Sequence, residues 1–239
     1  MTISVEVSAD AATLVGDVAR ALTSRLAAVQ ASGRVPRVVL AGGSIIEELH
    51  RALAASPGAV DWSRVEFWWG DERYVESWSA ERNCLAASRD LLGVVGAAAE
   101  LVHVPPATDS GQPVQDAAAT YAQEFPAEDF DVVLLGMGPD GHTCSLFPGR
   151  SDDVLSARDA VAVVDSPKPP ALRLSMTPAR LSRSTVVWLV ASGSAKAAAV
   201  GSALAAPGGT VDPVEVPAVA PRGREATVWW LDQDAAALL

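Results

Sequence analysis

Residues 131–148 read Asp131-Val-Val-Leu-Leu-Gly-Met-Gly-Pro-Asp-Gly-His-Thr-Cys-Ser-Leu-Phe-Pro148. The run from Asp131 to Leu135 is apolar and partly β-branched, which predicts a strand buried on both faces. Three glycines and a proline then end the strand in a loop that carries His142. Ligands of open α/β sheets bind outside the carboxyl ends of the strands, where glycines let the backbone approach closely. The stretch therefore predicts chemistry centred on His142.

An imidazole suits this position because it can accept and return a proton near neutral pH. His142 is thus a candidate general base, and Gly138 in the same loop is a candidate contact to the substrate. The alternative is a structural histidine in a capped turn, since short motifs of this kind are common. Cys144 could be proposed as a nucleophile that works with His142. Residues two apart on a turn rarely face each other, so we expect no covalent step through this thiol.

A second segment has the same strand-turn-helix pattern. Arg37-Val-Val-Leu-Ala predicts a strand, Gly42-Gly43-Ser44 a turn, and the residues up to Leu53 a helix. The start of a helix presents free backbone N–H groups and positive charge, so this turn is a candidate anion site. It lacks the Lys of a phosphate-binding P-loop and the three glycines of a dinucleotide site. The alternative is an ordinary helix cap by Ser44.

Three further segments place charged residues near the same edge of the predicted sheet. The strand 65–69 runs into Gly70-Asp71-Glu72-Arg73, and charges at the end of a buried strand face the ligand crevice. A solvated turn is the alternative. Arg173 and Lys196 lie on later turns, and the proline-rich segment 166–170 predicts an extended surface loop. We expect the strand ends and both basic turns to converge on one pocket.

Predicted strands and helices alternate along nearly the whole chain, which indicates one α/β domain over residues 1–239. The sheet should be mostly parallel and covered on both faces. Further strands are predicted at 5–7, 101–104, 161–164, 185–190 and 227–231, and helices at 11–29, 84–92, 114–125 and 233–238, with Asp10 and Asp232 as N-caps.

Composition limits the classes of function. Of 239 residues, 49% are hydrophobic and 20% charged, with a formal net charge of -11. This charge argues against nucleic acid and anionic membranes as partners. The two cysteines and three histidines are scattered, so we expect no metal site and no disulfide. No signal peptide or apolar run of about 20 residues is present, which predicts a cytoplasmic protein.

Six motifs occur in order along the chain. They are Leu-Ala-Gly-Gly-Ser (40–44), Gly-Asp-Glu-Arg (70–73), Gly-Met-Gly-Pro-Asp-Gly-His-Thr-Cys-Ser-Leu-Phe-Pro (136–148), Arg-Leu-Ser-Met-Thr (173–177), Gly-Ser-Ala-Lys (193–196) and Trp-Trp-Leu-Asp-Gln-Asp-Ala-Ala (229–236). Each is weak alone, but together they resemble the 6-phosphogluconolactonase family over nearly the whole chain. The resemblance implies a three-layer αβα sandwich with a mostly parallel, Rossmann-like sheet, as in glucosamine-6-phosphate deaminase. It also implies hydrolysis of 6-phosphoglucono-1,5-lactone in the pentose phosphate pathway, without metal or cofactor, by a monomer or small homo-oligomer.

The same resemblance implies roles for single residues. His142 would activate water, and Asp140 and Asp71 would orient it or the sugar hydroxyls. The substrate, with its phosphate held by the Gly-Gly-Ser turn and two cations, would contact Gly42, Gly43, Ser44, Arg73, Gly138, Arg173 and Lys196. A guanidinium grips phosphate with two hydrogen bonds and an ammonium adds a compact charge, which is consistent with this division.

Two departures from the family pattern concern phosphate binding. Ile45-Ile46 replaces the usual Thr-Pro after Gly-Gly-Ser, and Arg82-Asn83 replaces Ser-Asn. A deaminase or isomerase of the same fold is the nearest alternative, but such relatives have Asp-Glu-Tyr in place of Asp71-Glu-Arg73. A non-catalytic sugar-phosphate sensor is the other alternative, although no DNA-binding helix pair or basic face accompanies this sequence.

Overall fold

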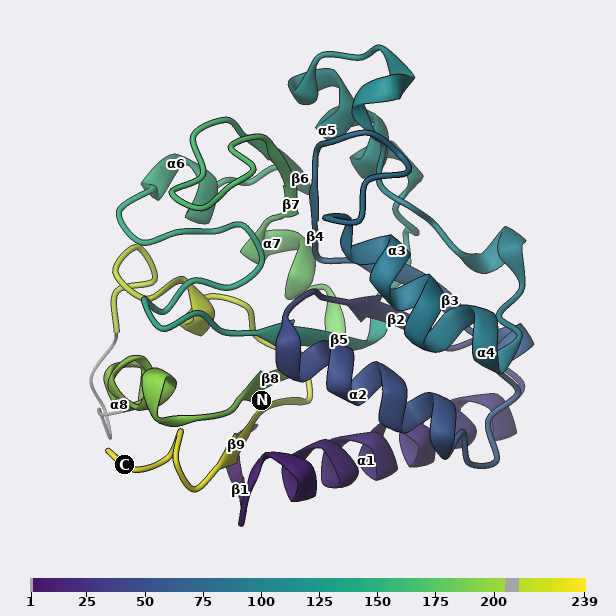
Figure 1. Cartoon of the computed structure of the whole chain (residues 1–239), viewed down its shortest axis with the longest axis vertical. Coiled ribbons are helices and arrows are strands. Elements are labelled where there is room, and N and C mark those ends of the chain that lie inside the picture. The colour runs from purple at the N-terminus through teal and green to yellow at the C-terminus, as the bar shows by residue number, and fades with distance from the viewer. Residues whose placement is uncertain (1, 205–210) are drawn as a thin grey trace.

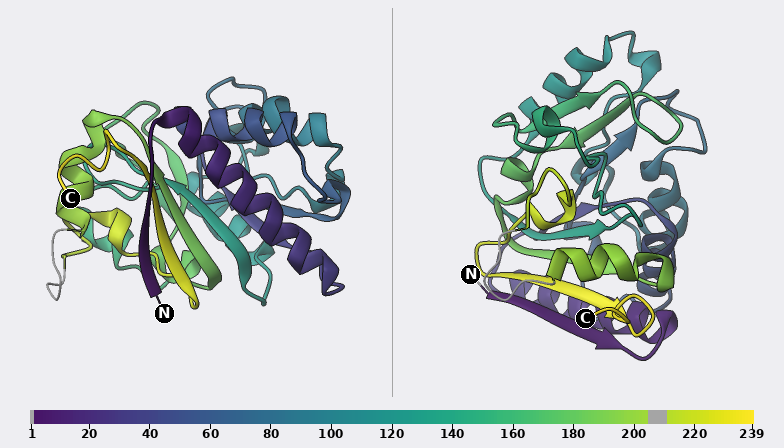
Figure 2. Two further views of the ribbon diagram at one scale, coloured as in Figure 1. Left: turned by 90° about the horizontal axis from the view of Figure 1, so that it is seen from below. Right: turned by 90° about the vertical axis from the view of Figure 1, so that its left-hand side faces the viewer.

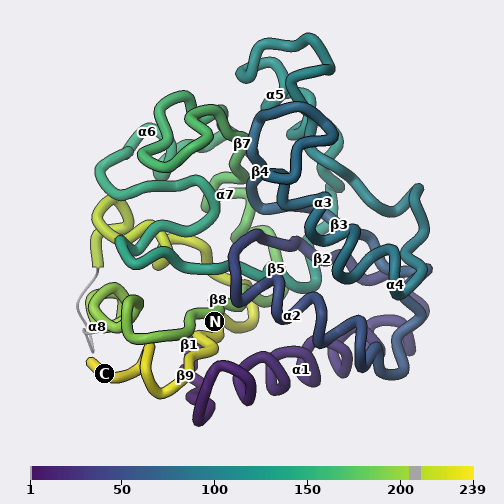
Figure 3. The backbone as a smooth tube through the Cα atoms, viewed as in Figure 1, coloured from purple at the N-terminus to yellow at the C-terminus, as the bar shows by residue number. Residues whose placement is uncertain are grey.

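A six-stranded sheet forms the centre of the computed structural model, which describes residues 2–204 and 211–239 (Figure 1). Its order is β1-β9-β8-β5-β2-β3, and every neighbouring pair is parallel. The strands are Thr2–Ser8 (β1), Arg37–Leu40 (β2), Glu66–Trp69 (β3), Phe130–Gly136 (β5), Ser184–Ala191 (β8) and Ala226–Asp232 (β9). Because the first and last strands pair, the two terminal strands lie at one edge of the sheet (Figure 3).

Helices cover both faces of this sheet (Figure 2). In β5, Val132 and Leu134 pack against α1 and α2, whereas Val133 and Leu135 face the side covered by α8. This alternation confirms the predicted three-layer αβα fold with a parallel central sheet. The helices are Ala11–Ala31 (α1), Ser44–Ala55 (α2), Asn83–Ala87 (α3), Gly93–Val95 (α4), Val114–Glu124 (α5), Ser151–Val154 (α6), Pro178–Leu181 (α7) and Ala197–Leu204 (α8).

Shorter turns complete the connections. They are Trp62–Arg64 (η1), Ala99–Leu101 (η3), Thr108–Ser110 (η4), Ser194–Lys196 (η5) and Pro217–Val219 (η6), with a π-helical turn Ser88–Leu92 (η2) inside the helix predicted at 84–92. Asp10 caps α1 as expected, because its carboxylate accepts the backbone N–H of Thr13 at 2.8 Å. Across the described ranges, no helix is both long and apolar enough to cross a membrane.

A second, antiparallel sheet was not predicted. It consists of Asp71–Arg73 (β4), Ala160–Val163 (β6) and Arg173–Met176 (β7), in the order β4-β7-β6. Gly70 links the two sheets, because its N–H donates to Leu40 at 2.8 Å while its carbonyl accepts from Met176 at 2.7 Å. The charged residues 71–73 therefore continue as a strand of the small sheet instead of forming a turn.

Two predicted elements are wrong. The expected strand at 101–104 is reduced to one bridge between Val102 and Phe67, since the preceding residues form η3. The expected helix at 233–238 is a series of turns. Asp232 does accept the N–H of Ala235 at 2.8 Å, but it is also the last residue of β9 and accepts from Gly193. One capping bond on a six-residue segment does not offset the cost of nucleating a helix.

Candidate active site

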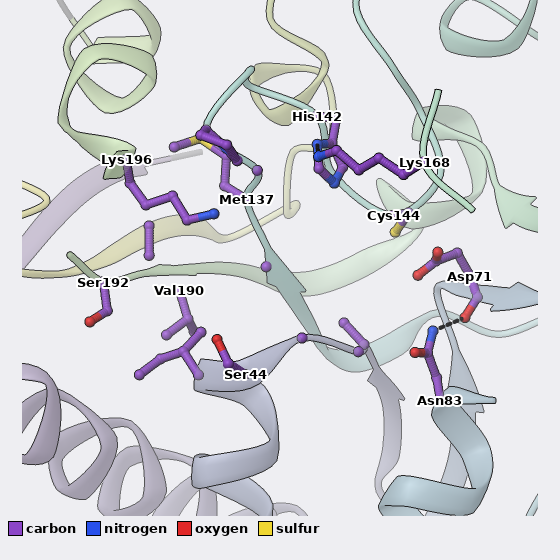
Figure 4. A pocket seen from close by; sticks show the side chains of 18 of the residues that line it. Ser44, Asp71, Asn83, Met137, His142, Cys144, Lys168, Val190, Ser192 and Lys196 are labelled. Atoms are coloured by element: carbon purple, nitrogen blue, oxygen red, sulfur yellow. Dashed lines mark hydrogen bonds between the residues drawn. The ribbon is translucent and has the colours of Figure 1, made fainter. Parts of the chain in front are cut away.

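The candidate site is a cavity of about 340 Å³ at the carboxyl ends of β2, β5 and β8. From the centre of the sheet, the chain proceeds from β2 to β3 on one side and from β5 through β8 to β9 on the other. The loops after β2 and β5 therefore diverge and leave a crevice between them, which is where open α/β sheets bind ligands. Figure 4 shows side chains from these separate loops directed into one space.

Nearly all the residues singled out in the sequence line this cavity: Gly42, Gly43, Ser44, Asp71, Arg73, Gly138, His142, Arg173 and Lys196. The expected convergence of strand ends and basic turns is thus present. Asp140 is the exception, since it contacts the His142 ring and does not line the cavity. Its contact with the His142 ring supports a role in orienting the histidine. The individual roles of these residues stay predictions.

The loop after β5 fixes the His142 ring by a tight turn. The N–H of Gly138 donates to the His142 carbonyl at 2.8 Å, and Gly141 adopts φ of 83°, which favours glycine. A Cβ on Gly138 would lie 1.9 Å from His142 Nδ1, so only glycine leaves room for the ring here. The position predicted as a backbone contact to substrate thus also makes space for the base.

The polar contacts of the His142 ring are made at Nδ1. Nδ1 contacts the Asp140 carboxylate and lies 3.2 Å from Lys168 Nζ, and Phe147 packs beside the ring at 4.9 Å between centroids. A carboxylate at Nδ1 holds the proton there, which leaves the lone pair of Nε2 to accept another. This is the arrangement that a general base requires.

Burial and charge set the ionisation of this pair. Burial is the largest influence on His142 and lowers its pKa, Asp140 opposes this, and Lys168 lowers it further. The net pKa of His142 lies below its ordinary value. Burial also disfavours ionised Asp140, but the hydrogen bond from His142 and the charges of His142 and Lys168 outweigh it and lower the carboxyl pKa. A neutral imidazole beside a carboxylate is the result.

A candidate anion site lies across the cavity from the histidine. Helix α2 begins after Gly43 without any side-chain cap, so the alternative of a cap by Ser44 is wrong, and its first N–H groups are free to bind a ligand. Opposite it, the turn before η5 is held by Asp232, which accepts the N–H of Gly193 at 3.0 Å. Lys196 follows and lines the cavity (Figure 4). Helix dipole and ammonium together favour a phosphate.

Asp71 enters the cavity from β4 and is nearly fully buried. Its carboxylate accepts from Ser145 Oγ at 2.7 Å, while Asn83 Nδ2 donates to its backbone carbonyl at 2.9 Å. Asn83 also packs against Gly42, where a Cβ would lie 2.0 Å from Asn83 Oδ1. Asn83 therefore connects the segments that carry Asp71 and Gly42. The family resemblance drew attention to the pair Arg82-Asn83, but Asn83 was not among the predicted site residues.

The neighbouring Glu72 is fully buried and does not face the cavity. It accepts the backbone N–H groups of Arg73 at 2.8 Å, Asn83 at 2.7 Å and Cys84 at 2.9 Å. Of the three charged residues expected to face the crevice, Asp71 and Arg73 line the cavity and Glu72 does not. Glu72 instead fixes the segment that carries Asn83.

Arg173 differs from the expected free phosphate cation. Its guanidinium donates to the carbonyls of Lys168 at 3.1 Å, Pro169 at 3.0 Å and Pro170 at 3.1 Å. It lines the cavity, but most of its donors hold the loop 166–170. Lys168 from that loop reaches His142 and was missed, because a single lysine among prolines has no motif to indicate a site.

The geometry gives little support to nucleophilic chemistry at Cys144. Burial raises the pKa of the Cys144 thiol well above its ordinary value, so the thiol stays protonated and is a poor nucleophile. Within residues 2–204 and 211–239, no group of three or more His, Cys, Asp or Glu is placed to hold a metal ion.

Comparisons with known proteins identify the family of this chain. A family model described as glucosamine-6-phosphate isomerases/6-phosphogluconolactonase matches residues 9–230. The chain is 42% identical over 249 aligned positions to 6-phosphogluconolactonase of Mycobacterium tuberculosis, covering 100% of this chain and 99% of the relative.

Solved structures show the same fold. The 6-phosphogluconolactonase of Thermotoga maritima aligns with a TM-score of 0.83 at 25% identity, over 97% of this chain and 100% of that one. A monomeric glucosamine-6-phosphate deaminase aligns with a TM-score of 0.80 at 20% identity over 100% of both chains, which shows the fold alone. The chain belongs to the family of glucosamine-6-phosphate isomerases and 6-phosphogluconolactonases.

Proposed function

We propose that this protein hydrolyses 6-phospho-D-glucono-1,5-lactone to 6-phospho-D-gluconate in the oxidative pentose phosphate pathway. The observation that carries the proposal is the pairing of two sites in one cavity: a histidine whose Nδ1 is held by Asp140, and the uncapped start of α2 facing Lys196. A base and an anion site at opposite walls suit a substrate with a lactone at one end and a phosphate at the other. The relatives named 6-phosphogluconolactonase support the same choice.

The reaction needs one proton acceptor and donors for developing charge. Nε2 of His142 takes a proton from water while the water oxygen attacks the lactone carbonyl carbon. The C–O bond to the ring oxygen then breaks, and the imidazolium returns its proton to that oxygen, which leaves a hydroxyl and a carboxylic acid that ionises. Arg73 lines the cavity and is a candidate donor to the phosphate or to the carbonyl oxygen.

The remaining expectations from the sequence form part of the same proposal. Residues 1–239 act as one catalytic domain, and the reaction uses no metal ion or cofactor. Nucleic acid and membranes are not partners, and the protein works as a monomer or small homo-oligomer. Phosphorylated sugars stay inside a cell because charged groups cross hydrocarbon only at high cost, so we place the reaction in the cytoplasm.

The test compares hydrolysis of phosphorylated and unphosphorylated gluconolactone, followed by proton release. Each charge-assisted contact to phosphate corresponds to about 10-fold or more in kcat/KM, so we expect the phosphorylated lactone to be preferred by at least that factor. Lys196→Ala should reduce this preference by raising KM for the phosphorylated lactone alone. Ammonia release from glucosamine 6-phosphate without lactone hydrolysis would contradict the proposal.

A further inference from the structure

Lys168 places a positive charge directly beside the histidine pair. Its Nζ lies 3.2 Å from His142 Nδ1 and 3.7 Å from Asp140 Oδ1, and 5.9 Å from the centroid of the Phe147 ring. The lysine comes from the loop between β6 and β7, which is distant in sequence from the loop after β5. Figure 4 shows its side chain extended toward the His142 ring.

The backbone under Lys168 is held in place. Its carbonyl accepts from the buried guanidinium of Arg173 at 3.1 Å and from Ser166 Oγ at 2.8 Å. Its own N–H donates to Ser166 Oγ at 3.3 Å, and Ser166 N–H donates to the Ala171 carbonyl at 3.0 Å. The Lys168 side chain therefore extends from a backbone position that hydrogen bonds hold in place, and Arg173 contributes to the site by holding this loop.

We propose that Lys168 is a positioning residue whose ammonium shares the Asp140 carboxylate with the imidazole and keeps His142 neutral between turnovers. This inference rests on the proposed function, in which His142 accepts a proton from water. Asp140 alone beside the ring would favour the imidazolium, and an imidazolium cannot act as a base. The ammonium of Lys168 next to Nδ1 repels an imidazolium and so opposes protonation of the ring, and it leaves Nε2 free to accept the proton from water.

Among the charged groups that affect the pKa of His142, Lys168 acts against the two carboxylates. Asp140 on the same loop raises the pKa of His142, Asp71 on β4 raises it weakly, and Lys168 lowers it in addition to the effect of burial. Removal of Lys168 should therefore stabilise protonated His142. Activity would then be lost at a higher pH on acidification, while the alkaline plateau stays close to that of the parent protein.

The experiment compares Lys168→Met and Lys168→Gln with the parent protein over the pH profile of kcat. Lys168 is partly exposed, so the loss on the acid side should be about 2- to 5-fold relative to the alkaline plateau. The loss should occur with phosphorylated and unphosphorylated lactone alike, because it originates at His142. Lys168→Arg should restore the parent profile. Lys196→Met is the matched control and should raise KM for the phosphorylated lactone without moving the acid limb.

A second readout does not depend on activity. The imidazole of His142 is titrated by NMR, its signal identified by its loss in His142→Asn, and Lys168→Met should move the titration to higher pH. Unchanged titration and an unchanged acid limb would overturn the role of Lys168. A rise in KM for the phosphorylated lactone alone would also overturn it, since that result indicates a phosphate contact. Absence of lactone hydrolysis in the parent protein would instead overturn the proposed function, while the titration still tests Lys168.

Discussion

Among single residues, His142 has the clearest expected effect on catalysis. General base catalysis contributes about 10² to 10⁴ in rate, so His142→Asn should lower kcat by that factor and leave KM nearly unchanged. In the parent protein kcat should fall on acidification, because only the neutral imidazole accepts a proton. Burial lowers the pKa of His142 from 6.5, so the fall should begin at a lower pH than for a free histidine.

The residual rate of His142→Asn provides the control, because it should lack this acid limb. A folded variant that keeps the parent kcat would remove His142 from the mechanism.

The same histidine shows how far residue-level reasoning from sequence reaches. The glycine-rich loop after an apolar strand predicted the position of His142, since both features are local. Lys168 and Asn83 could not be found in that way, because their place in the site depends on contacts between loops far apart in the chain. Arg173 was identified as part of the site, but its donors bind loop carbonyls that a sequence pattern does not reveal.

Among the elements, helix α2 carries Ile45-Ile46, the pair that replaces the usual Thr-Pro of the family. Ile46 is fully buried in the core under the sheet, whereas Ile45 lines the cavity beside the uncapped helix start. Of the two isoleucines, Ile46 therefore belongs to the core, and Ile45 is the one whose side chain can reach a phosphate bound at the helix start.

We expect Ile45→Thr to lower KM for the phosphorylated lactone by about 2- to 10-fold, the gain of one added hydrogen bond. The same variant should leave KM for unphosphorylated gluconolactone unchanged, because that substrate has nothing to place at the helix start. Steady-state kinetics with both lactones measure the effect. An equal change for the two substrates would mean that α2 does not bind the phosphate.

The strands of the parallel sheet could be predicted from sequence, whereas the small antiparallel sheet could not. The inner strands β2, β5 and β8 of the parallel sheet are buried apolar runs such as Val132–Leu135, and their composition and length were sufficient to predict them. The small antiparallel sheet was missed because β4 is three charged residues long and carries no hydrophobic pattern. Its pairing with β7 is decided by the bonds of Gly70 to two different strands, which are tertiary contacts.

Over the whole molecule, charge is distributed unevenly. The chain has a formal net charge of -11, yet Arg73, Lys168, Arg173 and Lys196 all line one cavity. Arg73 and Arg173 lie on β4 and β7 of the small sheet, Lys168 lies on the loop between β6 and β7, and Lys196 follows β8 of the large sheet. These segments reach one cavity because Gly70 joins the small sheet to the carboxyl edge of the large one. An acidic protein thereby keeps a locally basic pocket, in which an anionic substrate is selected by local charge and not by the overall field.

This concentration of cations also bears on the need for a metal. In many hydrolases a metal ion polarises the carbonyl and lowers the pKa of the attacking water. Here Arg73, which lines the cavity, can donate to the developing negative charge, and His142 can take the proton from water. A lactone is already an activated ester, so these two contributions are sufficient for modest acceleration. We therefore expect kcat/KM for the phosphorylated lactone to be the same before and after dialysis against EDTA. The measurement is repeated with zinc or magnesium added back to the dialysed protein, and recovery of lost activity by either ion would show that a metal takes part in the reaction.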